Sequence, residues 1–191
     1  MKMNYIERSK CVISGDPNLE LLHSLKDFPV FMGSVKHPER DDITLDMDWY
    51  ISPKSGLIQL KKLVPLDILY GNEHGSGLIG KNWHSHHVSF AEFIKKSNPN
   101  SVFEIGGLHG ILAKYFHELK KIKWKILEPN PIPVEGSEAE FIRGFFNEGF
   151  HLNEEFDAYI HSHVLEHIYD PKSFLDTLSK LVPLGKQVVF S

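Results

Sequence analysis

The residues best suited to chemistry begin at 102–110, where the sequence reads VFEIGGLHG. The carboxylate of Glu104 stands inside a short apolar run, and Gly106, Gly107 and Gly110 follow it. Glycines at the carboxyl end of a parallel strand let a ligand approach the backbone closely. This stretch therefore predicts a ligand-binding loop, and a tight strand-to-helix turn without a ligand is the alternative.

The glycine spacing and the charge of this loop indicate which ligand it suits. The glycines do not match G-x-G-x-x-G, the spacing that places a pyrophosphate, and Glu104 would repel a phosphate group. S-adenosylmethionine carries a sulfonium and an ammonium group and no phosphate, so the same carboxylate attracts it. We therefore expect this cofactor, with S-adenosylhomocysteine as its product, and not a nicotinamide dinucleotide.

Two later segments place further groups at the ends of predicted strands. The run WKILEPNP ends its apolar part at Glu128 and Pro129, and Glu128 can accept hydrogen bonds from both hydroxyls of a ribose. The run GFFNEGF offers Phe145 and Phe146 for stacking on an adenine and Asn147 for the edge of the base. The alternatives are a solvated glutamate and two core phenylalanines beside a polar turn.

The segment YIHSHVLEHIYDP places His161, Ser162 and His163 at the end of a fourth strand, in the same crevice. His163 and His167 are four residues apart, so they share a face of a helical turn. A histidine with a pKa of about 6.5 can take a proton from an acceptor hydroxyl at cellular pH. His167 is the first candidate base, with His163 beside it, and a histidine that caps the following helix is the alternative.

A second polar and aromatic cluster occupies the segment LYGNEHGSGLIGKNWHSHH. We expect this segment to bind the acceptor or the carboxylate of the cofactor through Tyr70, His74, Asn82, His84 and His86. The alternative is a loop that only packs two modules against each other.

These residues need a scaffold, and the pattern from residue 101 onward predicts one. Short apolar runs alternate with amphipathic stretches, which predicts successive βα units and a mostly parallel, Rossmann-like α/β sheet. Residues 1–95 are turn-rich and predict a small irregular module, so the expected domains are 1–95 and 96–191. The predicted strands are 101–105, 124–128, 140–145, 156–162 and 186–191, and the predicted helices are 110–121 and 171–182.

Composition excludes several classes of protein. The 191 residues carry a formal net charge of −4, with a pI near 6.3, which provides no general basic field for a nucleic acid. No window approaches the roughly 20 apolar residues of a membrane-spanning helix. The first residues lack a secretory signal, so a cytoplasmic location is expected. The 12 histidines are scattered without the spacing of a metal site, and no metal is expected.

With these segments in order, residues 101–191 resemble the class I S-adenosylmethionine-dependent methyltransferases. EIGGLHG resembles their first motif, ILEPNP the ribose-binding motif, FFN the adenine region and HVLEHIYDP the motif after the fourth strand. Leu108 stands where many members have a glycine. The resemblance implies a Rossmann-like fold and methyl transfer from S-adenosylmethionine, with His167 in the active site.

The first half is similar to the N-terminal module of the sugar C-methyltransferase-like proteins, which binds zinc through two CxxC pairs. Here Cys11 keeps one ligand position, whereas Ser14, Ser52 and Ser55 occupy the other three. Serine hydroxyls do not deprotonate near neutral pH and bind zinc poorly. The resemblance therefore implies a degenerate module that folds without the metal, with Cys11 as a small buried residue.

A full class I sheet has seven strands, whereas this sequence ends at the fifth, KQVVFS, so a sheet truncated after strand five is expected. An open sheet edge favours pairing, and we expect a homodimer through that edge. The resemblance implies a small-molecule acceptor from bacterial capsular polysaccharide biosynthesis, sugar- or nucleotide-linked and methylated on oxygen.

A phosphoramidate is the most specific version of that acceptor, and Lys81 and Arg143 are the candidates for holding its phosphate group. A sugar C-methyltransferase is the alternative enzyme, because the same histidines could remove a proton from a carbon acid. A non-catalytic subunit that binds the cofactor or a partner chain is the alternative of another class.

Overall fold

The computed structural model describes the chain except for residues 1–3, 31–37, 39–41 and 70–79. Two of the predicted site residues, Tyr70 and His74, therefore lie outside the described residues. No helix in the described ranges is long and apolar enough to cross a membrane.

The chain divides into two compact units, Met1–Gly75 and Ser76–Ser191. The division precedes helix α2 (Lys81–Lys95), whereas the sequence predicts it after residue 95. The position differs because α2 is part of the second unit. Its side chains Phe90, Ala91 and Ile94 are buried in the core of that unit.

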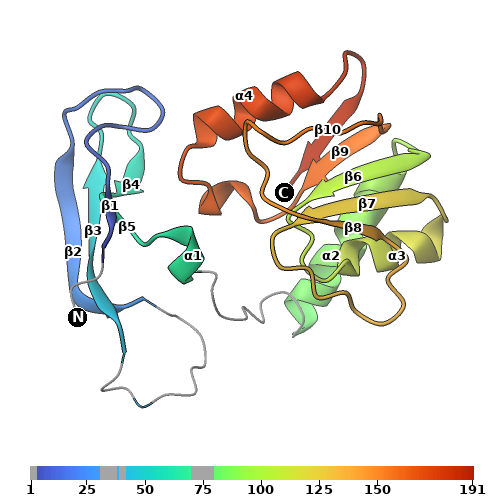
Figure 1. Ribbon diagram of the computed structural model, residues 1–191, viewed down its shortest axis with the longest axis horizontal. Helices are drawn as coiled ribbons and strands as arrows, with labels where there is room; N and C mark the ends of the chain where they lie inside the picture. Colours follow the sequence, from blue (N-terminus) through green and yellow to red (C-terminus); the bar gives the residue numbers. More distant parts are fainter. Residues whose placement is uncertain (1–3, 31–37, 39–41, 70–79) are drawn as a thin grey trace. The chain divides into compact units, whose positions relative to one another are not determined.

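The second unit is built on one parallel sheet (Figure 1). The strands pair in the order β10-β9-β6-β7-β8, and every pairing is parallel. The strand order reverses between β6 and β9, which is where ligands bind in sheets of this kind. The predicted Rossmann-like α/β fold is confirmed, since each predicted strand overlaps an observed one. The strands are β6 (Ser101–Ile105), β7 (Lys123–Glu128), β8 (Glu140–Arg143), β9 (Ala158–His161) and β10 (Gln187–Phe190).

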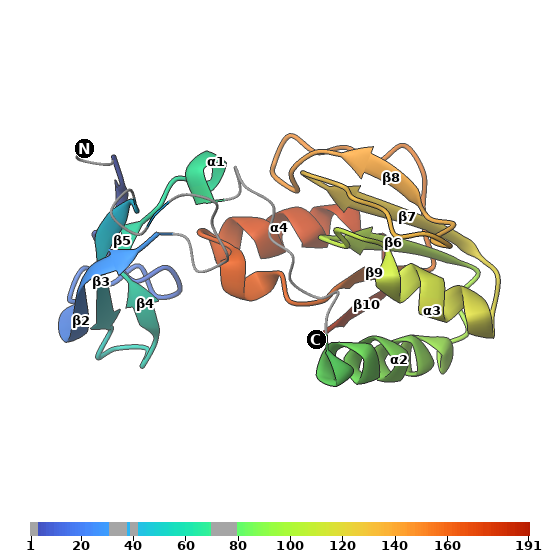
Figure 2. The ribbon, with the colours of Figure 1, turned by 90° about the horizontal axis from the view of Figure 1, so that it is seen from below.

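Helices pack on both faces of this sheet because strand side chains alternate between the faces. Val102 and Ile126 are buried in one cluster with α2 and α3 (Ile111–Leu119), which lie side by side (Figure 2). Phe103 and Leu127 are buried in a second cluster with α4 (Pro171–Leu181). Both predicted helices are confirmed.

Local signals fix the start of α4. The side chain of Asp170 accepts a hydrogen bond from the Ser173 backbone N–H at 3.0 Å, and Pro171 occupies the first helical position. An aspartate cap satisfies one of the free N–H groups of the first turn, and proline has no N–H there to lose. The short 3₁₀ helix η2 (Leu165–His167) lies between β9 and α4.

The first unit is antiparallel, and its sheet was not predicted. Its three-stranded sheet has the order β2-β3-β4, and the short strands β1 and β5 pair with each other. The elements are β1 (Ile6–Glu7), β2 (Glu20–Pro29), β3 (Thr44–Ile51), β4 (Ile58–Leu60), β5 (Lys62–Leu63) and helix α1 (Leu66–Leu69).

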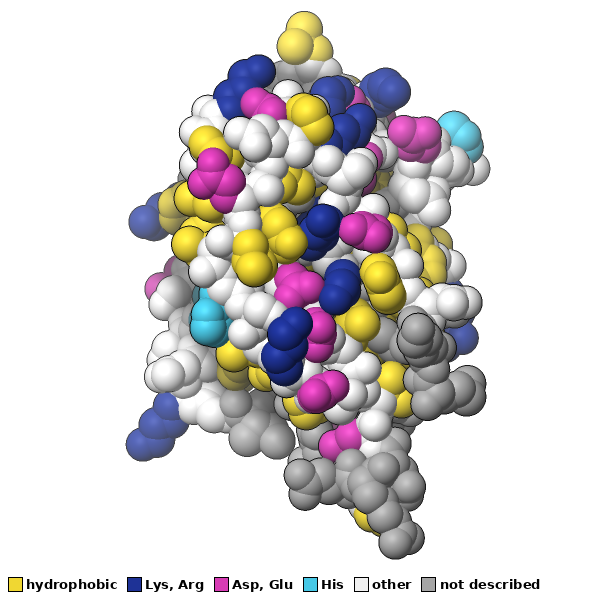
Figure 3. All heavy atoms as spheres, turned by 90° about the vertical axis from the view of Figure 1, so that its left-hand side faces the viewer, with side chains coloured by type: hydrophobic (Ala, Val, Ile, Leu, Met, Phe, Trp, Pro, Cys, Tyr) yellow, Lys and Arg dark blue, Asp and Glu magenta, His cyan; other side chains and the backbone are white. Residues whose placement is uncertain are grey.

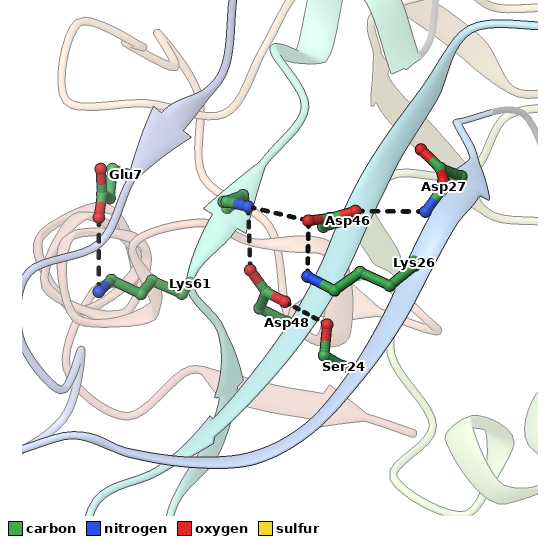
Figure 4. Close-up of polar contacts among 8 residues, drawn as sticks. Glu7, Ser24, Lys26, Asp27, Asp46, Asp48 and Lys61 are labelled. Atoms are coloured by element: carbon green, nitrogen blue, oxygen red, sulfur yellow. Dashed lines mark hydrogen bonds and ion pairs between the residues drawn. The ribbon is translucent and has the colours of Figure 1, made fainter.

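Charged side chains bridge the strands of the first unit (Figure 4). Asp46 accepts from Lys26 at 2.9 Å, and Asp48 pairs with Lys62 at 3.0 Å and accepts from the Ser24 hydroxyl at 2.6 Å. On the face drawn in Figure 3, Lys and Arg side chains are interleaved with Asp and Glu side chains. The Lys26 side chain is 69% exposed, so solvent screens its ion pair and the pair adds little to stability.

Two tight turns of the first unit meet at Cys11. In the first turn Gly15 N–H donates to the Cys11 carbonyl at 2.9 Å, and in the second Gly56 N–H donates to the Ser52 carbonyl at 2.8 Å. Both glycines have φ near +70°, at +70° and +73°, which favours glycine over other residues. The Cys11 thiol lies 3.3 Å from the Ser55 hydroxyl, so the two turns are in contact.

Cys11 is buried, as predicted, but its thiol is polarised. Burial by itself raises the pKa of the thiol, whereas hydrogen bonds from Ser14, Ser55 and nearby backbone N–H groups outweigh that effect and lower the pKa to about 6. Ser52 Oγ is also buried and has no hydrogen-bond partner among the described residues.

Candidate functional site

The loop between β6 and α3 contains the three predicted glycines. Gly106 and Gly110 have φ of +78° and +66°, and Leu108 between them has a φ of +26°. At Gly107, an added Cβ would lie 2.7 Å from the Glu104 carboxyl carbon, so only glycine lets this carboxylate lie directly beneath the loop. The loop is thus shaped around a buried acid.

Glu104 is almost completely buried and accepts a hydrogen bond from the indole N–H of Trp124 at 2.8 Å. Burial raises the pKa of Glu104 to about 7, the hydrogen bond from Trp124 opposes that rise, and the negative charge of Glu128 adds to it. A cation bound above the loop would favour the ionised form, and an anion would disfavour it.

Glu128 ends β7 and holds the loop from the neighbouring strand. One carboxylate oxygen accepts from the Leu108 N–H and the other from the Asn130 N–H, each at 3.1 Å. A carboxylate has about four acceptor positions, so Glu128 can accept hydrogen bonds beyond these two. Pro129, the next residue, is half-buried.

The segment after β7 is bonded to the same loop. Ile132 N–H donates to the Leu108 carbonyl at 3.0 Å, and Val134 N–H donates to the His109 carbonyl at 2.9 Å. The Ser137 hydroxyl donates to the Gly110 carbonyl at 3.1 Å. These bonds join the segment after β7 to the glycine loop, next to the strand ends that carry Glu104 and Glu128.

The residues expected at the adenine have local partners. Phe146 packs against Phe150 and Phe174, with ring centroids 5.8 Å and 5.1 Å away. The Asn147 side chain accepts from the Gly149 N–H at 3.0 Å. Their contact with an adenine stays a prediction.

At the end of β9, the chain positions two residues differently. His161 is buried, its ring is stacked on Phe190 at 5.3 Å, and burial lowers its pKa. Ser162 lies beside α2 instead, with its hydroxyl 2.9 Å from His86 Nε2 and 2.8 Å from the Ser191 hydroxyl.

Helix α2 and the residues after β9 form a group of three rings. The ring centroid of His163 lies 4.8 Å from that of Trp83 and 4.8 Å from that of His86. His163 has a φ of +52°, an uncommon conformation for a histidine, and its Nδ1 lies 3.3 Å from a Glu166 carboxylate oxygen. Trp83, His86 and His163 are called the ring group below.

Other predicted site residues lie apart from the ring group. The Nδ1 atom of His84 is 2.7 Å from the Tyr115 hydroxyl on α3, so His84 and His86 leave α2 in different directions. Asn82 and His167 are exposed, and no ring contact joins His167 to His163 in the described ranges. The shared face predicted for these two histidines is not formed, because η2 is 3₁₀ and begins only at Leu165.

Sequence reasoning did not single out three residues that the structure brings to this region: Trp83, Trp124 and Glu166. Trp83 precedes His86 by three residues on α2, a spacing that places side chains together on a helical turn, whereas His163 precedes η2 and its contact with Glu166 does not follow from helical spacing. The sequence therefore contained a signal for the contact between Trp83 and His86. The contact of Trp124 with Glu104 depends on strand register, which the sequence does not reveal.

A hollow of about 520 Å³ lies between the first turns of α2 and α3. Lys81, His84, Lys114 and Tyr115 are among the residues that line it. Within the described residues, no group of three or more His, Cys, Asp or Glu side chains is arranged to hold a metal ion.

Comparison with known proteins gave structural likenesses only. No protein-family model and no curated protein matches the chain. The N-methyltransferase NodS from Bradyrhizobium japonicum WM9, solved with S-adenosylhomocysteine, is 15% identical with a TM-score of 0.49, over 58% of this chain and 62% of that one. The glycopeptide N-methyltransferase MtfA is 16% identical with a TM-score of 0.45, over 55% and 52%.

The plantazolicin methyltransferase BpumL, also solved with S-adenosylhomocysteine, is 14% identical with a TM-score of 0.42, over 55% of this chain and 44% of that one. The match thus spans about half the length of these solved structures. At such identities a match describes the arrangement of the backbone and not an activity.

Proposed function

We propose that the second unit binds S-adenosylmethionine and transfers its methyl group to a small acceptor. The observation that carries this proposal is the pair of buried carboxylates, Glu104 and Glu128, at the carboxyl ends of neighbouring strands beneath a glycine loop. A cationic, phosphate-free cofactor suits two carboxylates, whereas a pyrophosphate does not.

The two carboxylates, as hydrogen-bond acceptors and negative charges, suit this cofactor. The open acceptor positions of Glu128 suit the ribose hydroxyls, and the raised pKa of Glu104 leaves it ready to ionise next to a cation. The bound cofactor would supply an activated methyl group. Catalysis then depends on positioning the acceptor and excluding water.

Calorimetric titration with S-adenosylhomocysteine and, separately, with NADH tests the cofactor class. We expect micromolar binding of the first and none of the second. NADH binding alone would replace the proposal with a reductase, and binding of neither would leave a Rossmann-like fold without this cofactor. Cofactor binding without turnover on any acceptor would favour the alternative of a non-catalytic subunit.

For the acceptor, we propose an oxygen atom of a small sugar- or nucleotide-linked metabolite of bacterial capsular polysaccharide biosynthesis, with a phosphoramidate as the most specific form. The motif resemblance supports this class, and the lysines that line the hollow beside α2, Lys81 and Lys114, are suited to a phosphate group. Arg143, the other candidate, is exposed at the end of β8. Sugar C-methylation is the second candidate. The position of the methyl group in the product, on oxygen or on carbon, distinguishes the two reactions.

For the first unit, we propose that the two turns at Cys11 descend from a zinc-binding module. Support comes from the contact between the turns and from the buried, unpartnered Ser52 Oγ at one former ligand position. One thiol and three hydroxyls do not fit zinc, so no role for a metal follows.

A cytoplasmic location and a homodimer through the sheet edge stay predictions. The edge strand β10 exposes Val188 and Phe190, which line a hollow of about 590 Å³ together with Phe93 of α2. Pairing along this edge would cover these side chains.

A further inference from the structure

The ring group lies where the proposed reaction needs a proton acceptor, at the carboxyl end of β9. His163 is 45% exposed at its side chain, so it can meet an acceptor from solvent while its ring is held by Trp83 and His86. His167, the residue that motif resemblance favours, has no comparable ring contact among the described residues and lies on the exposed side of η2.

Glu166 contacts one of the two ring nitrogens of His163. The contact between Nδ1 and the carboxylate, at 3.3 Å, favours the tautomer in which Nδ1–H donates to Glu166. In that tautomer Nε2 carries a lone pair and can accept a proton. A carboxylate behind an imidazole also stabilises the charged form that results.

His86 supports the same arrangement from α2. Its Nε2 is hydrogen-bonded to Ser162, the residue before His163, and its ring touches the ring of His163. Burial and the neighbouring charge of His163 lower the pKa of His86, so the neutral form of His86 is favoured beside His163.

We propose that His163 accepts the proton of an acceptor hydroxyl, that Glu166 orients its ring, and that His86 positions it through Ser162. This assignment rests on the proposed methyl transfer. As the acceptor oxygen bonds to the methyl carbon, the carbon–sulfur bond breaks with its electrons left on sulfur, and the hydroxyl proton moves to Nε2 of His163. The resulting imidazolium faces Glu166, and His86 and Glu166 are positioning residues.

The test measures the imidazoles directly and needs no acceptor. Long-range ¹H–¹⁵N spectra of the full, ¹⁵N-histidine-labelled chain report the tautomer of each ring, with His163 assigned from the H163N variant. Diethyl pyrocarbonate, which reacts with neutral imidazole nitrogens, reports the reactivity of each histidine by mass spectrometry. We expect His163 in the Nδ1–H form and Glu166→Ala to shift it toward the Nε2–H form.

The same variant should slow modification of His163 about two- to fivefold, the range of an exposed ion pair, and leave His167 and His84 unchanged. S-adenosylhomocysteine should protect His163 but not His84, which faces α3. An Nε2–H tautomer in both proteins, or equal rates for His163 in both, overturns the assignment. If S-adenosylhomocysteine does not bind, the proposed function itself is wrong. If it binds but the tautomer and modification rate of His163 are the same in both proteins, only the assignment of His163 is wrong.

Discussion

In each of the two units, two loops meet at buried side chains, but the side chains differ. They are Cys11, whose thiol lies against the exposed Ser55, in the first unit, and Glu104 and Glu128 in the second. In the first unit, backbone hydrogen bonds within each turn close the turns, whereas in the second a carboxylate itself accepts from the loop backbone. In both units a central side chain, the Cys11 thiol or the Glu128 carboxylate, also accepts a hydrogen bond from a loop N–H, so the contrast teaches that the first unit adds backbone closure to a contact that the second makes with a side chain.

The same contrast appears in the acidity of the buried groups. Several hydrogen-bond donors surround the Cys11 thiol and lower its pKa to about 6, whereas burial dominates at Glu104 and raises its pKa to about 7. The first cluster therefore stabilises a negative charge by itself. The second cluster does not, and a cation bound beside Glu104 would supply that stabilisation.

The largest effect should come from restoring thiols in the first unit. The triple substitution Ser14→Cys, Ser52→Cys and Ser55→Cys gives four thiols on two closed turns, and tetrahedral zinc binding at such sites contributes about 10 kcal/mol or more at neutral pH. We expect one zinc per chain and a higher Tm in the variant, measured by elemental analysis and calorimetry. The unchanged chain is the control, and stoichiometric zinc in that protein would contradict our account of the serines.

The second-largest effect concerns the free energy of unfolding, which the buried Glu104 makes dependent on pH. Its folded pKa of about 7 lies above the ordinary value of 4.5, so between these pH values the folded state holds more protons than the unfolded state. The free energy of unfolding should then fall by about 3 kcal/mol as the pH rises from 4.5 to 7. Glu104→Gln should remove this dependence, as measured by urea unfolding across that range, and an unchanged pH profile would contradict the burial of an ionisable acid here.

The smallest effect concerns ligand binding at Glu128 in the second unit. Glu128→Ala should weaken binding of S-adenosylhomocysteine by about tenfold or more, because hydrogen bonds to a charged group contribute roughly 1.5–3 kcal/mol. Glu135→Ala is the matched control, since Glu135 is exposed on the neighbouring segment and its loss changes the charge equally. Equal calorimetric affinities for the two variants would place the ribose elsewhere.

Much of the second unit was predictable because its strands are short apolar runs separated by amphipathic helices. The loop, Glu104 and Glu128 followed from strand-end chemistry, since parallel strands bring their carboxyl ends together. The domain boundary was missed because the buried face of α2 depends on packing against Leu112 and Phe116 of α3, which no local pattern reveals.

The first unit was harder to predict because β2 lacks an alternating pattern. Leu21, Leu22 and Leu25 are all exposed, so apolar residues do not mark its inner face. The ring group likewise combines α2 with the turn after β9. His86 and Ser162, which are in contact there, are 76 residues apart in the sequence. Spacing within a segment cannot reveal such a contact.

The buried acid beneath the glycine loop can also exchange its proton for a bound cation. With a pKa of about 7, Glu104 is close to half protonated in the free protein at neutral pH. A cation that settles above it displaces that proton into the solvent. Binding of the proposed cationic cofactor would therefore be linked to proton release, and its heat would depend on the ionisation enthalpy of the buffer.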